Sequence, residues 1–371
     1  MRSKFTCKGT MSTSPENPDN AILAWAKDRY PIAKFVEWAK HKTVPVGPNA
    51  FWYYFGGITL FLFLIQVGTG ILLMFYYKGS ADTAFASVRF ISAKVPFGWL
   101  IRSVHAWSAN LMILSAFIHM FSVFFMRAYR KPRELTWLSG IVLLALCMGF
   151  GFSGYLLPWN QLAFFATKVG TDIVGIIPVI GEPMMYVLRG GEDVTGSTLP
   201  RFFALHVAFF PALLTLFIGA HLFFIQLQGI HEPEAWEAHP EQRKTMPFFP
   251  HFFMREMLLW LVTLNILAVL AVFYPAELGI EADPFSPAPA GIKPEWYFLA
   301  TFEFLKYMPG HIGPIEGEQF GLLLISLGFI GWCLVPWIDR GKNPTLTKIV
   351  MAGGIAILIF LSIMTYLGHS G

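Results

Sequence analysis

Four histidines lie inside long apolar stretches of the chain. His105 and His119 are 14 residues apart in one stretch, and His206 and His221 are 15 residues apart in another. In a helix that turns about 100° and rises about 1.5 Å per residue, each set shares one face and spans about 21 Å. Imidazoles from facing helices are axial haem ligands, so the pattern predicts two bis-histidine haem sites. For any single histidine, the alternative is a packing residue or a proton relay.

The direction of these stretches decides which histidines meet. A third apolar stretch lies between them, so as membrane helices they run parallel. His105 is expected to face His206, and we call these two the first pair. His119 is expected to face His221, and these two are the second pair. Two haems would lie one above the other inside a four-helix bundle.

Glycines repeat the histidine spacing on the two other helices of this bundle. Gly56 and Gly70 are 14 residues apart, as are Gly140 and Gly154. Because these helices run opposite to the histidine helices, Gly56 and Gly140 are expected at the depth of the second pair, and Gly70 and Gly154 at the depth of the first. A missing Cβ lets the backbone approach the edge of a flat macrocycle. Close helix packing is the alternative for any one glycine.

Three cations lie near the predicted haem sites. Arg102 lies just before His105 of the first pair, and Lys131 and Arg133 follow the inner end of the helix that contains His119 of the second pair. We expect them to meet haem propionates. The alternative is that their charged ends simply reach toward the water at the membrane surface.

The positions of these residues require membrane-spanning helices. The chain has 371 residues, of which 55% are hydrophobic and 13% are charged. Several apolar runs exceed the roughly 20 residues that cross a hydrocarbon core, and in lipid each must be helical. We predict an all-α, polytopic membrane protein with about seven transmembrane helices, near residues 51–77, 101–126, 135–157, 201–227, 256–275, 318–338 and 346–367.

The basic residues predict the orientation in the membrane. Of the 27 Lys and Arg, 18 lie on the side of the N-terminus and 9 on the opposite side. The positive-inside rule therefore places the N-terminus inside, the first pair near the outer face and the second pair near the inner face. The net charge of +4 reflects these flanks and does not indicate binding to nucleic acid.

The N-terminal segment predicts a helix at the membrane surface and no signal peptide, and the cysteines do not form a metal-binding motif. Residues 21–42 mix apolar and charged residues and predict an interfacial amphipathic helix that is interrupted at Pro31. No apolar run before residue 50 has the pattern of a signal peptide. The three cysteines are scattered without a CxxC or CxxCH motif, which argues against zinc, iron–sulfur and CxxCH-type haem sites.

Several motifs resemble the cytochrome b family of the bc1 and b6f complexes. The likeness runs from about residue 43 to residue 345. The N-terminal part resembles the b6 subunit, and the C-terminal part resembles subunit IV, fused to it. The motifs are DTAFASVRFI, FGWLIRSVH, KPRELTW, GFSGYLLPWNQ, IPVIGEP, LRGG, STLPRFFALH and EADPFSPAPAGIKPEWYFLATFEFLKYMPG. The resemblance implies segment 1–50, a di-haem domain over 51–230, a linker over 231–255 and a three-helix domain over 256–371.

The resemblance also implies roles for residues. The first pair would bind a low-potential haem and the second pair a high-potential haem. A quinol pocket would be lined by Pro294, Glu295, Trp296 and Tyr297, and on its other wall by Gly154, Tyr155, Pro158, Trp159 and an amphipathic helix within 166–180. Glu295, Tyr297 and Tyr155 are the catalytic candidates, with Glu295 taking a quinol proton. The alternative for Glu295 is a residue that caps the following helix.

Two departures from the family pattern limit these implications. Tyr54 stands where the b6 subunit has the cysteine that attaches an extra haem, so no covalent c-type haem is expected. Gln226 stands where b6 has an arginine after the last histidine of that helix. The residues of an inner quinone site are not identified by the sequence.

The resemblance predicts a cytochrome b subunit of a quinol:cytochrome c oxidoreductase with two b haems. Its partners would be a Rieske iron–sulfur protein and a c-type cytochrome, in a dimeric complex in a bacterial cytoplasmic membrane. One alternative is a haem-b anchor of a quinone-linked dehydrogenase, which leaves the PEWY motif and the last three helices unexplained. A transporter is the other, but it predicts broken helices and charges at mid-depth.

Overall fold

The protein is an array of long helices with two small antiparallel sheets. The structure, a computed structural model, describes residues 18–47, 49–234, 236 and 239–370. Its α-helices are α1 (Pro18–Arg29), α2 (Ile32–His41), α3 (Tyr54–Met74), α4 (Ala84–Lys94), α5 (Gly98–Phe125), α6 (Glu134–Tyr155), α7 (Gln161–Gly175), α8 (Gly181–Arg189), α9 (Thr198–Ala204), α10 (Phe210–Gln228), α12 (Phe253–Phe273), α13 (Trp296–Lys306), α14 (Gly317–Cys333), α15 (Val335–Ile338) and α16 (Pro344–Ser370).

Short irregular elements connect these helices. The 3₁₀-helices η1 (Ala50–Tyr53) and η3 (Pro240–Gln242) and the π-helical turns η2 (Leu205–Phe209) and η4 (Phe248–Phe252) lie between or extend the longer helices. Strand β1 (Thr43–Pro45) pairs antiparallel with β2 (Thr245–Pro247), and β3 (His311–Ile312) pairs with β4 (Ile315–Glu316). The β1–β2 pair fastens the N-terminal segment to the segment that precedes α12.

Six helices of the described chain are long and apolar enough to cross a membrane. They cover Ala50–Met74, Gly98–Phe125, Glu134–Tyr155, Thr198–Gln228, Phe248–Phe273 and Pro344–Ser370. These six match six of the seven predicted spans, so the expected polytopic α-helical membrane protein is confirmed.

The remaining predicted span, residues 318–338, is shorter than the sequence suggested. Over residues 318–338 we expected one continuous helix, but α14 has 17 residues and ends at Cys333. A separate turn of helix, α15, follows and contains Pro336. Proline has no backbone N–H and its ring obstructs the preceding turn, which explains why the apolar run does not continue as one helix.

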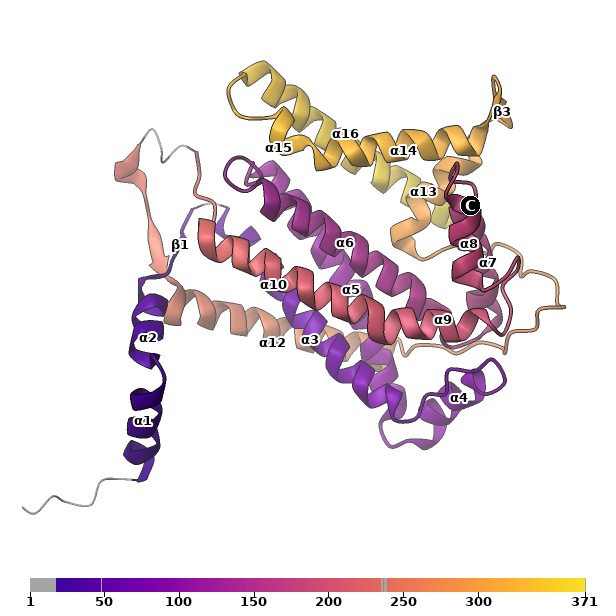
Figure 1. Ribbon diagram of the computed structural model, residues 1–371, viewed down its shortest axis with the longest axis horizontal. Coiled ribbons are helices and arrows are strands. Elements are labelled where there is room, and N and C mark those ends of the chain that lie inside the picture. The colour runs from indigo at the N-terminus through magenta and orange to yellow at the C-terminus, as the bar shows by residue number, and fades with distance from the viewer. Residues whose placement is uncertain (1–17, 48, 235, 237–238, 371) are drawn as a thin grey trace, which may run out of the picture.

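A bundle of α3, α5, α6 and α10 forms the centre of the molecule (Figure 1). Helix α3 packs along α5, and α10 packs along α6. The core between them is apolar, with buried residues Leu62, Phe63, Met112, Ile113, Cys147 and Leu214. A few buried hydroxyls add polar contacts, such as the 2.8 Å bond between Thr59 and Ser115.

The C-terminal helices cover the bundle on two different sides. In Figure 1, α12 runs along one side of the bundle, whereas α14 and α16 lie on the opposite side. Helix α12 contacts α3 and α5, and α13 contacts α14 and α16. Helix α12 thus packs with the bundle and α13 with the other C-terminal helices, and the three-helix domain over 256–371 stays a prediction.

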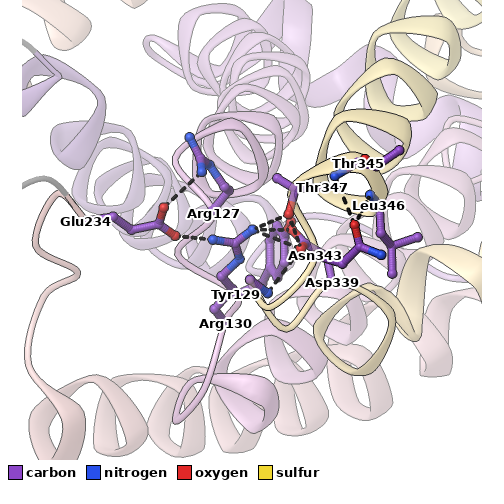
Figure 2. A network of polar contacts seen from close by, with 10 residues as sticks. Arg127, Tyr129, Arg130, Glu234, Asp339, Asn343, Thr345, Leu346 and Thr347 are labelled. Carbon is purple, nitrogen blue, oxygen red and sulfur yellow. Dashed lines mark hydrogen bonds and ion pairs between the residues drawn. The ribbon is translucent and has the colours of Figure 1, made fainter.

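A polar network joins the bundle to the C-terminal helices at the end where α5 meets α6. Figure 2 shows Arg130 between Glu234 and Asp339, and Arg127 as a second partner of Glu234. The Asp339 carboxylate accepts bonds of 2.6 Å from Tyr129 and 2.7 Å from Arg130. Asp339 is only 2% exposed. The loop after α5, the linker and the turn before α16 are thus held by one half-buried arginine.

The N-terminal helices are separate from the bundle. Helix α1 ends at Arg29 and α2 begins at Ile32, so the break that the sequence predicted at Pro31 is present. Figure 1 shows α1 and α2 extending away from the bundle beside β1. An interfacial location for these two helices stays a prediction.

Candidate functional site

The first pair comes together as the parallel direction of its helices requires. His105 on α5 and His206 on the α9–η2–α10 helix have ring centroids 6.2 Å apart. An imidazole nitrogen binds a transition metal at about 2 Å. Two such bonds, together with the distance from each bound nitrogen to its ring centroid, add up to about the observed separation. The two rings can therefore hold one metal ion between them.

The second pair lies further along the same two helices, toward their C-terminal ends. His119 and His221 interact electrostatically with each other. Both pairs thus join α5 to the helix that contains α10. The structure places all four predicted histidines in the interior of the bundle.

Each predicted glycine lies against the histidine that the spacing argument assigned to its depth. A Cβ built on Gly56 would lie 3.1 Å from the ring of His119, and one on Gly70 would lie 3.4 Å from the ring of His105. On the other glycine helix, a Cβ on Gly140 would lie 3.4 Å from the ring of His221.

The tightest of these contacts is at Gly154. A Cβ there would lie 2.6 Å from the ring of His206. Real Cβ atoms do not approach ring atoms so closely. The four glycines therefore leave backbone at the places where a macrocycle edge would need room, which fits a haem in each site.

A π-helical turn aligns the first pair with the second. A regular helix would place His206 and His221, 15 residues apart, about 60° from each other. The turn Leu205–Phe209 contains one additional residue, and the Phe210 amide bonds to the Leu205 carbonyl. The effective spacing becomes 14, as on α5. Pro211 follows the turn and has no amide hydrogen for a regular bond. No pattern in the sequence predicted this turn.

Three of the four histidines have a hydroxyl partner at Nδ1. Thr69 lies 2.8 Å from Nδ1 of His105, and Ser139 lies 2.8 Å from Nδ1 of His221. For His206, Ser153 lies at 3.2 Å and the Phe150 carbonyl at 3.1 Å.

These partners fix the ring orientation, because a bond at Nδ1 leaves Nε2 free to point toward the facing imidazole. His119 differs from the other three. Its buried Nδ1 has no hydrogen-bond partner within the described residues.

The PEWY segment forms the start of α13. Glu295 precedes the helix, and its side chain makes no capping hydrogen bond. Burial raises the pKa of the Glu295 carboxyl above its ordinary value. The capping alternative is therefore not supported by a side-chain contact, whereas a half-buried carboxyl suits proton transfer. The Pro294 side chain is half-buried beside it.

The two aromatic residues of this segment contact the bundle. The Trp296 indole donates a 2.8 Å hydrogen bond to Asn110 on α5. The Tyr297 hydroxyl occupies the space beside Gly151 on α6, where a Cβ would collide with it. Burial raises the pKa of Tyr297, and the nearby Glu295 raises it further. Asn110 and Gly151 were not singled out from the sequence, since only tertiary packing reveals their partners.

The second predicted wall of the quinol pocket is only partly near PEWY. Tyr155 at the end of α6 interacts electrostatically with both Glu295 and Tyr297. Trp159 instead lies in a buried apolar cluster and contacts Phe164. Its carbonyl accepts a 3.1 Å bond from the Ala282 amide. The turn after α6 that contains half-buried Pro158 is thereby fastened to the loop that leads into PEWY.

Two of the three predicted propionate ligands have protein partners. Arg102 donates bonds of 2.7 Å and 2.6 Å to the carbonyls of Ala276 and Glu277. Arg133 donates a 3.3 Å bond to the Gln228 carbonyl, and its Nε has no partner in the described chain. Lys131 is exposed. Of the three, Arg133 retains an unused donor, and the propionate roles stay predictions.

Two residues at the second-pair end extend the sequence interpretation. Tyr54, in the place of the b6 cysteine, stacks on Phe252 with ring centroids 4.5 Å apart. Glu256, in the first turn of α12, is 7% exposed and lies directly against Gly57. Its carboxylate accepts a 3.2 Å bond from Trp260. An acidic residue at the start of an apolar span was the available signal for Glu256, and the sequence interpretation missed it.

Comparisons with known proteins agree with this arrangement. Residues 41–229 match the family described as Cytochrome b/b6/petB, and residues 281–371 match Cytochrome b(C-terminal)/b6/petD. The cytochrome bc complex cytochrome b subunit of Chlorobaculum thiosulfatiphilum is 48% identical over 94% of this chain and 80% of that protein. Cytochrome b6 of Crocosphaera subtropica is 43% identical over 59% of this chain and 99% of its own length.

A more distant relative and a solved structure are also similar to this chain. Cytochrome b of Rhodobacter capsulatus is 34% identical over 88% of this chain and 78% of that protein. A chain of a hyperthermophilic respiratory Complex III superimposes with a TM-score of 0.76 at 26% identity, covering 94% of this chain and all of that one.

Helices with paired interior histidines and both family matches define a membrane-bound electron-transport protein, and the chain belongs to the cytochrome b/b6 family. Within that family it is a cytochrome b of the bc, bc1 or b6f type, in which the b6-like and subunit IV-like parts form one chain.

Proposed function

We propose that this chain is the di-haem subunit of a quinol:cytochrome c oxidoreductase. It would oxidise quinol near the outer face and send one electron across the membrane to a quinone near the inner face, contributing to proton translocation. The observation that carries this proposal is the arrangement of four interior imidazoles in two facing pairs, each with glycine backbone beside the rings.

The two histidine pairs suit two b haems. His105 and His206 would hold the outer, low-potential haem, and His119 and His221 the inner, high-potential haem. Bound haem supplies a carrier of single electrons. The axial rise of about 21 Å between the pairs covers most of the hydrocarbon thickness. The aromatic ring at Tyr54 fills the place of a cysteine, so a covalent c-type haem is not part of the proposal.

The PEWY segment supports quinol oxidation at the outer end. Glu295 is half-buried and without a capping bond, so its carboxylate can accept a proton and release it to water. Tyr297 and Tyr155 lie close enough to interact with it and can orient a quinol hydroxyl. Pro294, Trp296, Pro158 and Trp159 complete the pocket in the proposal.

The inner end has a candidate for proton uptake. Glu256 is a buried carboxylate on α12, beside the glycine pair of α3 that meets His119. Reduction of a quinone consumes protons, and a desolvated carboxyl is a suitable donor. We therefore assign Glu256 to the inner quinone site.

Partners supply the remaining steps. A Rieske iron–sulfur protein would take the other electron and pass it to a c-type cytochrome. The relatives that carry the name cytochrome bc complex and the likeness to a respiratory Complex III support a multi-subunit complex, and we propose a homodimer in a bacterial cytoplasmic membrane with the N-terminus inside. A haem-b anchor of a dehydrogenase would not need the PEWY segment.

Redox-titrated difference spectra of the purified complex test the proposal. Two b haems per chain, reduced at two potentials, are expected, and one haem or none would refute it. His206→Leu should remove only the low-potential haem, and His221→Leu only the high-potential haem. His311→Leu, which changes an exposed histidine of β3, is the control and should retain both.

A further inference from the structure

We infer that the hydroxyl groups at Nδ1 of three histidines, with no such group at His119 among the described residues, set the difference in potential between the two haems. This inference rests on the proposed function. Both haems would have the same axial ligands, so the difference must come from the surroundings. The structure assigns it to Thr69, Ser139 and Ser153.

The direction of each hydrogen bond can be read from the hydroxyl's other partner. Thr69 donates its hydrogen to the Ile65 carbonyl at 2.6 Å, so its oxygen accepts from the Nδ1–H of His105. Ser153 donates to the Phe150 carbonyl at 3.0 Å and likewise accepts from His206. The same Phe150 carbonyl lies 3.1 Å from Nδ1 of His206. Both imidazoles of the first pair therefore donate a hydrogen bond.

The second pair is asymmetric. Ser139 donates to the Thr136 carbonyl at 2.9 Å and accepts from His221. Nδ1 of His119 has no partner among the described residues. The nearest hydroxyl in sequence, that of Ser122, bonds to the His119 backbone carbonyl at 2.7 Å and is not used by the ring. One imidazole of the inner pair thus lacks an acceptor.

An acceptor at Nδ1 makes an imidazole a more basic ligand. A more basic ligand stabilises the oxidised iron, which carries the larger positive charge, and lowers the potential. Two donating imidazoles at the outer site and one at the inner site give the outer haem the lower potential. The resulting order favours electron transfer from the outer haem to the inner one.

Replacing the hydroxyls tests this inference. Thr69→Val should raise the midpoint potential of the outer haem alone, and Ser139→Ala that of the inner haem alone. For Thr69→Val we expect about a tenfold change in the ratio of reduced to oxidised haem, which is 59 mV for a one-electron couple. Ser139→Ala and Ser153→Ala should give smaller rises, because the Thr136 carbonyl remains beside His221 and the Phe150 carbonyl beside His206. Potentiometric titration of the whole complex and the low-spin EPR signals of each haem are the measurements.

Matched variants separate the bond from general packing. Thr69→Ser keeps the hydroxyl and should have the same outer potential as the parent protein. This variant tests the hydrogen bond even where Thr69→Val lowers the yield of folded protein. Ser122→Ala removes a hydroxyl that bonds only to backbone and should leave both potentials unchanged. Unchanged or lowered potentials in Thr69→Val and Ser139→Ala, with both haems bound, would overturn the inference and leave the proposed function standing. Absence of the haems would overturn the proposed function itself.

Discussion

The two ends of the bundle hold similar histidine pairs in different surroundings. At the His105 end, the segments that approach the pair are the PEWY segment and the loop after α12, held by hydrogen bonds such as Trp296 to Asn110 and Arg102 to the carbonyls of the loop. At the His119 end, Arg130, Glu234 and Asp339 form a charged network. The ligand geometry is therefore shared by the two ends, whereas the segments that cover them differ: the proposed quinol pocket lies at the first end, and the network of Arg130, Glu234 and Asp339, which we call the charged joint, lies at the second.

The largest expected effect tests the shared geometry. Gly154→Ala places a methyl group 2.6 Å from the ring of His206, so the first pair should lose its haem while the second retains it. Haem content and redox-resolved spectra measure this loss. Gly68→Ala on α3 is the control, because a Cβ there meets no atom within 4 Å. Retention of both haems in Gly154→Ala would contradict the role of the glycines.

The next effect concerns proton transfer at the pocket end. Glu295→Gln removes a proton acceptor and should reduce quinol oxidation by roughly a hundredfold. In the parent protein, burial raises the pKa of Glu295, so the active carboxylate forms at a higher pH than for an exposed glutamate. Turnover should therefore rise with pH through this raised pKa, and the variant should lose that dependence. Glu316→Gln, at an exposed residue of β4, is the control.

The next prediction concerns the charged joint, which should contribute to the free energy of unfolding. Asp339→Asn leaves Arg130 without its buried partner and should lower the free energy of unfolding by about 3 kcal/mol. Thermal unfolding of the solubilised complex measures it. Asp193→Asn, which breaks an exposed pair with Lys168, should change stability by less than about 1 kcal/mol. Similar effects of the two variants would contradict the proposed joint.

The pH dependence of the joint has a definite sign. Burial alone would raise the pKa of Asp339, but its bonds from Tyr129, Thr347 and Arg130 outweigh burial and hold the pKa below its ordinary value. The contribution of Asp339 is therefore fully present above the pKa of an unfolded aspartate and is lost as the pH falls through the lowered value. Asp339→Asn should remove this acid-dependent loss.

The smallest effect concerns positioning in the pocket. Asn110→Leu removes the acceptor of the Trp296 indole and should change the KM for quinol a few-fold, by about 1 kcal/mol, with less change in kcat. Steady-state kinetics measure this change. Asn265→Leu on α12, whose amide bonds only to its own helix, is the control. A loss of kcat with KM unchanged would assign Asn110 a different role.

The sequence was sufficient where chemistry depends on regular spacing. Helix periodicity alone placed Gly56 beside His119 and Gly140 beside His221, and the structure confirms both contacts. Apolar length alone located six spans. Apolar length did not predict the end of α14, because a run of apolar residues does not show that the helix breaks before Pro336.

Contacts between distant segments could not be predicted. The Arg130–Asp339 pair joins residues 209 positions apart, and Asn110 meets Trp296 across 186 positions. One polar side chain in an apolar helix has no partner that the sequence can name. The position of Arg102 against two backbone carbonyls was hidden for the same reason.

The π-helical turn at Leu205–Phe209 has a consequence for engineering the chain. Because it absorbs one residue, deleting one residue there and replacing Pro211 by alanine should yield an ordinary helix in which His206 still faces His105. In a uniform helix, deleting one residue would rotate every later side chain relative to the earlier ones. Here the same deletion should leave the later side chains in their original positions. The separation of two ligands along this chain is therefore adjustable without moving either ligand in space.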